Sequence, residues 1–285
     1  MSTTFSDTRL AFISDRIDDL RKSEIKVAKY VLANSEKVIH CSVGEIAESA
    51  QVSEPTVIRF CRAMGFKGYQ DFKINLAQTI IPVLKSIHET VDENDGIPQV
   101  VRKVFNANIS AVSNTLNTVD LNAIQAAVDM LAESYRISFF GLGGSAALAM
   151  DAHHKFFKIG IPCSWFNDAH MQAMSAALMQ PGETLVVISH SGSSKDIVES
   201  LRIAREAGAS TIAIVSQQKS PVSNSADVSM CVHSSETNYR FEPMSSRIAQ
   251  LCLIDALSVG VSLRKQDEIV QSLAKTRRAL VDKRY

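Results

Sequence analysis

The chain carries no net charge, since its 285 residues hold 30 Lys and Arg against 30 Asp and Glu. A protein that coats nucleic acid is usually basic, so any DNA contact here must come from a local patch. A hydrophobic fraction of 46% and a charged fraction of 21% are ordinary for a globular protein with a core. The length allows about two domains of roughly 100–200 residues each.

The chain has few cysteines, and no two of them lie close together in the sequence. An odd number of five without close pairs argues against a disulfide framework and favours reduced thiols. Five histidines lack any recognised metal spacing, so neither a metal nor another cofactor is expected. These histidines are His153, His154, His170, His190 and His233.

Neither a leader nor a membrane span is expected from the sequence. Residues 1–10 have no basic stretch followed by an apolar run, which argues against a signal peptide. The most apolar late segment, residues 248–263, is interrupted by Asp255 and reads as too short and polar for a span. We therefore expect a cytoplasmic protein with no membrane partner.

The first part of the chain, residues 1–81, reads as helices throughout. Apolar side chains from Ile25 to Leu32 recur at helical spacing, with Ser23 as a candidate cap. The acidic, polar run of residues 92–96 indicates a linker, so residues 82–120 are predicted to be a linker and connecting helix. Helices are expected over residues 100–116 and 121–131.

After Glu133 the hydrophobic period changes, and short β-rich runs alternate with helical stretches. This alternation predicts an α/β domain over residues 121–285, with a parallel sheet and helices on both faces. The fold class is therefore an all-α domain followed by an α/β domain. Strands are expected at 137–140, 163–166, 184–188, 211–215 and 228–232, and helices at 146–158, 196–207 and 245–263.

Within the first part, residues 42–64 have the pattern of a helix-turn-helix. Ser42 and Glu45 have capping-box spacing, which predicts a first helix over residues 43–49 and then a turn over residues 50–52. Ser53 is a good N-cap for a second helix, and Pro55 suits its first turn. The inner side of that helix is apolar, with Val57, Ile58, Phe60 and Cys61.

The second helix would enter the major groove with its N-terminal residues facing base edges. From Arg59 to Lys73 the sequence has four basic residues and one acid, which is the local patch that a neutral chain needs. Arg59 suits either guanine or phosphate. The predicted DNA contacts are Ser53, Glu54, Thr56, Arg59, Arg62, Lys67 and Lys73.

By pattern alone, a plain helical bundle explains residues 53–64 about as well as DNA binding does. However, the string VSEPTVIRFCRAMGFKGYQDFK at residues 52–73 resembles the N-terminal domain of RpiR-type bacterial regulators. The resemblance implies that this part of the chain binds double-stranded operator DNA.

Two loops in the second part have the chemistry of a phosphate site. Residues 141–145 (GLGGS) and 189–194 (SHSGSS) each follow a predicted strand and precede a helix, whose N-terminal N–H groups attract anions. In a parallel sheet both loops lie at the carboxyl ends of strands. The predicted effector contacts are Gly143, Ser145, Ser189, His190, Ser191, Gly192 and Ser194.

Two other interpretations of these loops stay open. Gly141, Gly143 and Ala146 also fit a dinucleotide fingerprint, with Asp168 as a candidate ribose partner. Alternatively, the serines at 193 and 194 merely cap a helix, although that leaves the rest of the serine cluster unexplained.

The two loops resemble those of the sugar isomerase (SIS) domain, a sugar-phosphate-binding fold, and a helix-turn-helix followed by SIS is the order of the RpiR family. The resemblance covers nearly the whole chain. It implies a repressor of sugar catabolism genes controlled by a phosphorylated sugar acid, 2-keto-3-deoxy-6-phosphogluconate. Residues 245–285 are helical and apolar enough to contribute an interface in a homodimer or larger oligomer.

Glu242 and Arg247 are weaker pocket candidates beside the start of the last long helix. In SIS isomerases a glutamate can move a proton between two sugar carbons, so Glu242 keeps an enzyme, a sugar-phosphate isomerase with a helical extension, as the alternative. Arg247 suits an effector carboxylate or an acid on a neighbouring helix. The preferred hypothesis is a regulator without catalytic residues.

Overall fold

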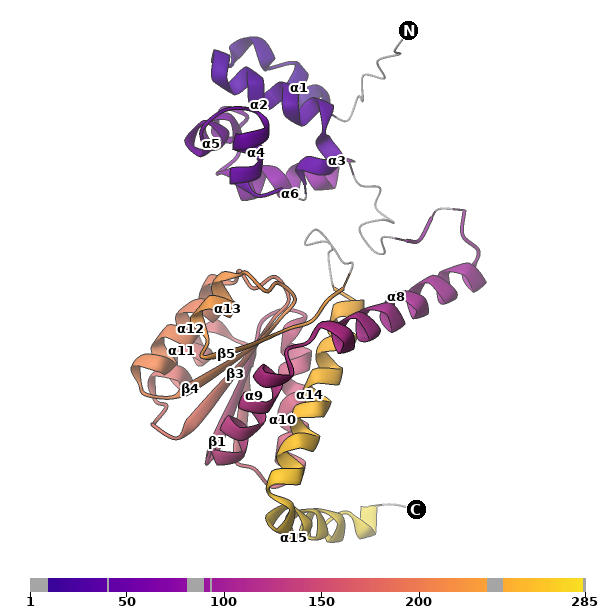
Figure 1. Ribbon diagram of the computed structural model, residues 1–285, viewed down its shortest axis with the longest axis vertical. Helices are drawn as coiled ribbons and strands as arrows, with labels where there is room; N and C mark the ends of the chain where they lie inside the picture. Colours follow the sequence, from indigo (N-terminus) through magenta and orange to yellow (C-terminus); the bar gives the residue numbers. More distant parts are fainter. Residues whose placement is uncertain (1–9, 40, 81–89, 93, 235–242, 284–285) are drawn as a thin grey trace. The chain divides into compact units, whose positions relative to one another are not determined.

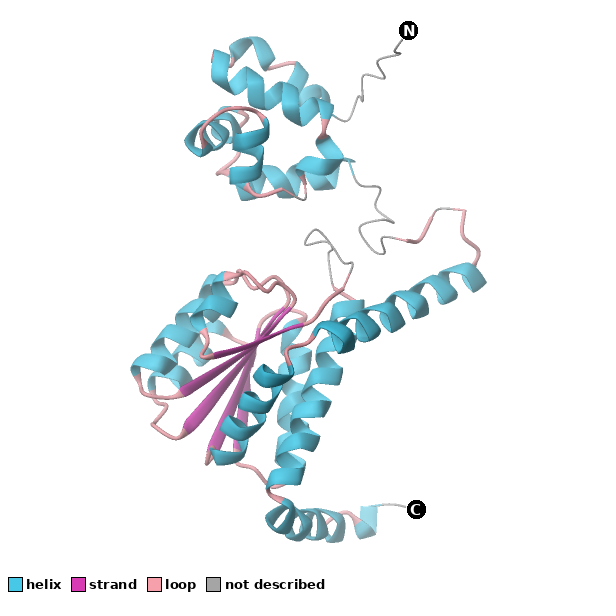
Figure 2. Ribbon diagram, in the orientation of Figure 1, coloured by secondary structure: helices cyan, strands magenta, loops and turns pink. Residues whose placement is uncertain are grey.

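The structure is a computed structural model that describes residues 10–39, 41–80, 90–92, 94–234 and 243–283 (Figure 1). It divides into two compact units, with the boundary between Val100 and Val101. The first unit is helical and the second is α/β, as expected (Figure 2). The finer division at residues 81 and 120 remains a prediction.

The helical unit packs short helices around one apolar core. Phe60 and Phe72 are fully buried at its centre, with ring centroids 5.3 Å apart in an edge-to-face arrangement. Ile46 is buried in the same core. The elements are α1 (Ala11–Ser14), η2 (Ile17–Asp19), α2 (Lys22–Ala33), α3 (Ser35–Val38), α4 (Val43–Ser49), α5 (Glu54–Ala63) and α6 (Tyr69–Ile80).

Helix α2 begins earlier than predicted. Ser23 lies inside the helix, and Arg21 is the N-cap, because the Arg21 backbone N–H donates to the Glu24 carboxylate at 3.0 Å. The predicted cap at Ser23 is therefore wrong.

The α/β unit contains one five-stranded parallel sheet in the order β2-β1-β3-β4-β5. This is the order of doubly wound, flavodoxin-like folds, in which ligands bind where the direction of winding changes. The strands are β1 (Arg136–Gly141), β2 (Cys163–Phe166), β3 (Glu183–Ser189), β4 (Ser210–Val215) and β5 (Val228–Cys231). The five strands lie within about a residue of their predicted bounds.

Helices cover both faces of the sheet (Figures 1 and 2). Val186 and Ile188 of β3 pack towards α9, α10 and α14, whereas Leu185 and Val187 pack towards α11, α12 and α13. Both faces are apolar, as buried parallel strands require. The helices are α8 (Ile97–Thr118), α9 (Leu121–Glu133), α10 (Ser145–Lys158), α11 (Ala169–Ala177), α12 (Lys195–Glu206), α13 (Pro221–Ser225), α14 (Ser245–Arg264) and α15 (Gln266–Arg278), followed by η3 (Val281–Lys283).

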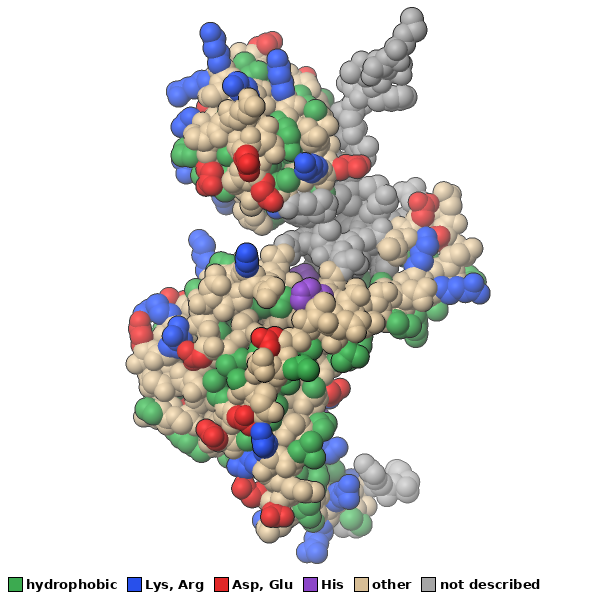
Figure 3. Space-filling model, in the orientation of Figure 1, with side chains coloured by type: hydrophobic (Ala, Val, Ile, Leu, Met, Phe, Trp, Pro, Cys, Tyr) green, Lys and Arg blue, Asp and Glu red, His purple; other side chains and the backbone are tan. Residues whose placement is uncertain are grey.

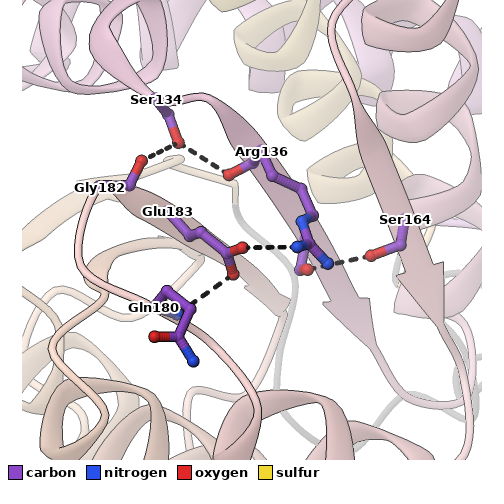
Figure 4. A network of polar contacts seen from close by, with 7 residues as sticks. Ser134, Arg136, Ser164, Gln180, Gly182 and Glu183 are labelled. Atoms are coloured by element: carbon purple, nitrogen blue, oxygen red, sulfur yellow. Dashed lines mark hydrogen bonds and ion pairs between the residues drawn. The ribbon is translucent and has the colours of Figure 1, made fainter.

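A polar network joins β1 and β3 at their amino ends, opposite the candidate site (Figure 4). Arg136 pairs with the buried Glu183 carboxylate at 3.0 Å. The Ser134 hydroxyl donates to the carbonyls of Arg136 and Gly182, at 2.7 and 3.2 Å. These contacts align the two strands whose carboxyl ends form the site.

Helix α14 ends one residue beyond the predicted bound at 263, and among the described residues it is the one helix that is long and apolar enough, by length and composition only, to cross a membrane. The expectation that this segment is too short and polar for a span is therefore wrong by length and composition. Its packing accounts for the apolar residues, because Leu253, Ile254 and Leu257 are buried in the core against the sheet.

Candidate functional sites

Helices α4 and α5 form the predicted helix-turn-helix. The Ser42 hydroxyl accepts from the Glu45 backbone N–H at 3.3 Å, and the Ser42 N–H donates to the Glu45 carboxylate at 2.6 Å, which confirms the capping box. The turn places Gln51 at φ +52°, and Val52 packs against the core between the helices. Helix α5 then begins after Ser53, as predicted, although the Ser53 side chain makes no capping hydrogen bond.

Most of the predicted DNA contacts lie on the surface of this unit, over which Lys and Arg side chains are spread (Figure 3). Thr56 is the exception. It was expected near the outward face, but it is only 4% exposed. Its hydroxyl bonds within the unit, because the side chains of Ser53 and Arg59 lie 3.0 and 2.8 Å from it. The exposed members are Ser53, Glu54, Arg59, Arg62 and Lys67.

Lys73 also differs from the expectation, because it serves the fold of the unit. Its ammonium donates to the Cys41 carbonyl at 2.7 Å and lies 5.7 Å from the centre of the Tyr69 ring. The Tyr69 hydroxyl donates to the same carbonyl at 2.7 Å. Lys73 is half-buried, and burial lowers the pKa of its ammonium. Lys73 therefore holds the residue that precedes the Ser42 cap.

In the α/β unit, the two predicted loops meet at the change in winding direction. One follows β1 and the other follows β3, and these strands are neighbours in register from Arg136–Glu183 to Gly141–Ile188. In the sheet, β2 lies on one side of β1 and β3 on the other. The chain therefore winds in one direction up to β2 and in the opposite direction from β3 onward. The carboxyl ends of β1 and β3 are thus the place where such folds bind ligands.

The serine-rich loop turns tightly at Gly192, whose φ is +63°. The buried Ser189 hydroxyl accepts from the Gly192 N–H at 3.2 Å, and the Ser191 hydroxyl accepts from the Ser193 N–H at 3.3 Å. A Cβ at Gly192 would lie 2.2 Å from the Ser220 hydroxyl oxygen. Only glycine fits this turn, which brings backbone and hydroxyl groups close together.

The glycine-rich loop is equally constrained. A Cβ at Gly141 would lie 2.4 Å from the Ser145 carbonyl oxygen, and Gly143 has φ +55°. Ser145 is half-buried at the first position of α10. Within the described part of the chain, no side chain caps the N-terminus of α10 or of α12. The N-cap position of α12 is Ser194, yet its side chain makes no capping bond, so capping does not explain the serine cluster.

His190 connects the serine-rich loop to residues that the sequence analysis missed. Its Nδ1 lies 2.9 Å from the Ser246 hydroxyl at the start of α14 and 3.1 Å from the Ser216 hydroxyl after β4. Gln250 of α14 donates to Ser216 at 3.4 Å. Ser246 and Gln250 are buried. The sequence offered two signals for these residues: polar side chains within the apolar segment 245–263, and a serine directly after the predicted strand at 211–215.

The same two-part organisation appears in known proteins. Residues 8–82 match the helix-turn-helix domain of the rpiR family, and residues 130–260 match the SIS domain. HexR of Escherichia coli (strain K12) is 37% identical over 273 residues, which are 96% of this chain and 94% of that protein. This chain belongs to the RpiR family of transcriptional regulators. HexR of Pseudomonas aeruginosa is also 37% identical, over 96% of this chain and 95% of that protein.

Solved structures share the fold of this RpiR-family chain. The Vibrio vulnificus NanR protein, complexed with ManNAc-6P, has a TM-score of 0.76 at 23% identity, and the match covers 97% of this chain and 99% of NanR. The sugar isomerase domain of an RpiR transcription factor from Sphaerobacter thermophilus has a TM-score of 0.58 at 23% identity, covering 63% and 99%.

Three candidate residues of this RpiR-family chain remain, and each has a different outcome. Arg247 is half-buried in the first turn of α14, next to Ser246. Glu242 lies outside the described residues. Asp168, the candidate ribose partner, caps α11, because its carboxylate accepts from the Met171 N–H at 2.9 Å. That engagement weakens the dinucleotide interpretation. Among the described residues, no group of three His, Cys, Asp or Glu side chains is arranged to hold a metal ion.

Proposed function

We propose that this protein is a repressor of sugar catabolism genes, and that a phosphorylated sugar acid bound in its SIS domain controls its affinity for operator DNA. The observation that carries the proposal is the meeting of the two loops after β1 and β3 at the change in winding direction. As a regulator of chromosomal genes, it would act in the cytoplasm.

The two loops offer the groups that a phosphate requires. The N-termini of α10 and α12 have no side-chain cap, so they would offer a phosphate the positive ends of two helix dipoles. The hydroxyls of Ser145, Ser189, Ser191 and Ser194 would add donors around the phosphate oxygens. Arg247 would pair with the carboxylate of a sugar acid, which neutral sugar phosphates lack. The likeness in fold to NanR, which was solved in complex with ManNAc-6P, supports a phosphorylated ligand, and we propose 2-keto-3-deoxy-6-phosphogluconate.

His190 would transmit occupancy of the site. It belongs to the loop that surrounds the phosphate and also contacts Ser246 on α14. For the ligand to release DNA, it must bind more tightly to the arrangement with low DNA affinity. A ligand-induced shift of the loop would reach α14 through this contact.

The test measures DNA binding by fluorescence anisotropy, on duplexes that the protein itself enriches from a random library. We expect 2-keto-3-deoxy-6-phosphogluconate to weaken binding more than glucose 6-phosphate, ManNAc-6P or inorganic phosphate does. The double substitution Ser191→Ala with Ser194→Ala should keep DNA binding and abolish the response, whereas Ser225→Ala in α13 should change neither. An unchanged response in the double variant would reject the site. Isomerisation of ketose and aldose phosphates would favour the enzyme alternative.

We also propose that the protein acts as a homodimer, with α8 in the interface. Large apolar side chains recur every four residues from Ile97 to Ile109 on α8, and Phe105 and Ile109 are 64% and 62% exposed. Such a stripe on a long helix requires a partner, and a second copy suits the paired half-sites that helix-turn-helix proteins read. The other exposed members are Ile97, Val101 and Leu116.

The oligomeric state can be tested by analytical ultracentrifugation. Phe105→Glu places a charge in the stripe and should convert dimers to monomers at micromolar concentration. Asn106→Glu adds the same charge to the same turn outside the stripe and should leave the dimer intact. Equal sedimentation of the two variants would argue against an interface on α8. In that event, residues 245–285 would be the next surface to test.

A further inference from the structure

A buried carboxylate lies beside the predicted reading helix. Glu24, in the first turn of α2, is 5% exposed although it belongs to neither helix of the helix-turn-helix. One carboxylate oxygen accepts from the Arg21 N–H at 3.0 Å. The other is 3.8 Å from Nε of Arg59 on α5. A carboxylate is costly to bury unless it is paired, so the Arg21 N–H and the Arg59 guanidinium together stabilise the Glu24 carboxylate.

Arg59 is held from a second side as well. Its Nη2 donates to the Thr56 hydroxyl at 2.8 Å, and this hydroxyl lies 3.0 Å from that of Ser53. Thr56 is buried, so it offers the arginine a fixed acceptor. The Arg59 side chain nevertheless remains 47% exposed. Its Nε edge is therefore turned inward, while its end is accessible to a partner.

A guanidinium fixed in this way suits the recognition of a base better than that of a phosphate. Two edges of the fork can form paired hydrogen bonds, and the Nε edge already faces Glu24. Nη2 uses one of its two N–H groups for Thr56, so its second N–H and an N–H of Nη1 remain for a guanine, whose O6 and N7 accept such a pair. Holding the long side chain in place also removes much of the rotamer entropy that binding would otherwise cost.

The other exposed cations near α5 lack this support. Arg62 and Lys67 are exposed, and within the described part of the unit neither the Arg62 guanidinium nor the Lys67 ammonium forms an ion pair with an acidic side chain. Cations without such an ion pair suit phosphates, which supply affinity without sequence information. Arg59 therefore differs from Arg62 and Lys67 because its side chain is held by Glu24 and Thr56.

We infer that Glu24 is a positioning residue that orients Arg59 to read one guanine of the operator end-on. The inference rests on the proposed function, because it requires that α5 enters the major groove. It resolves the choice between guanine and phosphate for Arg59 in favour of guanine. It also gives Thr56 a role different from the predicted DNA contact: Thr56 fixes the arginine that makes it.

The test is in vitro selection from a random duplex library with the full-length chain, followed by affinities at several salt concentrations. Glu24→Gln should reduce the preference for guanine at one operator position at least fivefold, consistent with the value of a bidentate contact. The slope of affinity against salt should stay unchanged, because phosphate contacts remain. Arg59→Lys keeps the charge but removes the fork, and it should reduce the preference at the same position.

Glu45→Gln is the matched control, because it makes the same charge change at the equivalent position of the α4 capping box and should leave the base preference unchanged. If Glu24→Gln does not fold, as judged by circular dichroism, Thr56→Val removes the second tether and should give the same positional loss. A wild-type profile in a folded Glu24→Gln or Thr56→Val variant would overturn the inference. Failure of the wild-type chain to enrich any sequence would instead reject the proposed function.

Discussion

The helical unit and the α/β unit build their candidate sites in different ways. The first presents side chains of one helix and the turn after it, all within residues 53–67, from an apolar core beneath them. The second joins two loops that are separated by more than forty residues in the sequence and relies on backbone groups at strand ends. Substitutions should therefore act locally through side chains in one unit and through backbone geometry in the other.

The largest expected effect comes from the core of the helical unit. Phe60→Ala should lower the free energy of unfolding by about 3–5 kcal/mol, because it removes a fully buried ring that packs on Phe72. Leu185→Ala, in β3, is the matched change in the other unit, at about 2–5 kcal/mol. In calorimetry each substitution should shift one transition only. A single transition moved by both would show that the units unfold together.

Backbone geometry is tested at Gly192. Alanine there must adopt a left-handed conformation, at a cost of about 1–2 kcal/mol, and its Cβ would also clash with Ser220. We expect thermal destabilisation and loss of the effector response. Gly143→Ala faces a similar φ, but no described atom lies within 4 Å of its Cβ, so it should be the milder variant. Equal effects would mean that the contact with Ser220 is unimportant.

A smaller effect is expected at the start of the helix-turn-helix. Ser42→Ala removes the cap of α4 and should cost about 1 kcal/mol at neutral pH. Hydrogen bonds from Ser42 lower the pKa of Glu45, so the contribution of this carboxylate is present above its usual pKa and is lost as the pH falls through the lowered value. Alanine keeps the residue 42 N–H, which is the main cause of the lowered pKa, so only the part of the difference between wild type and variant in chemical denaturation that comes from the Ser42 hydroxyl should be lost in acid.

The smallest effect distinguishes the two lysines of the predicted basic patch. Lys67→Ala should reduce the slope of log affinity against log salt by about 1, because one phosphate contact is lost. Lys73→Met should leave this slope unchanged and lower the stability of the helical unit, since its ammonium binds the Cys41 carbonyl. A reduced slope in Lys73→Met would restore Lys73 to the set of DNA contacts.

Local sequence determined much of this protein. The capping pair Ser42 and Glu45, the turn, and the five strands follow from patterns over a few residues, because caps, turns and hydrophobic periods are short-range properties. The glycine and serine loops could be assigned to strand ends for the same reason. The predicted cap at Ser23 failed because the helix begins two residues earlier, where the Glu24 carboxylate accepts from the N–H of the N-cap residue Arg21 and is itself buried beside another helix.

Only the tertiary structure decided which groups meet. The strand order brings the loops after β1 and β3 together, and no local pattern encodes that order. Packing between helices buries Thr56, engages Lys73 and sets Glu24 beside Arg59. The sequence identified a basic patch by composition, but each side chain's role depends on its contacts across the core, which are set by residues far away in the chain.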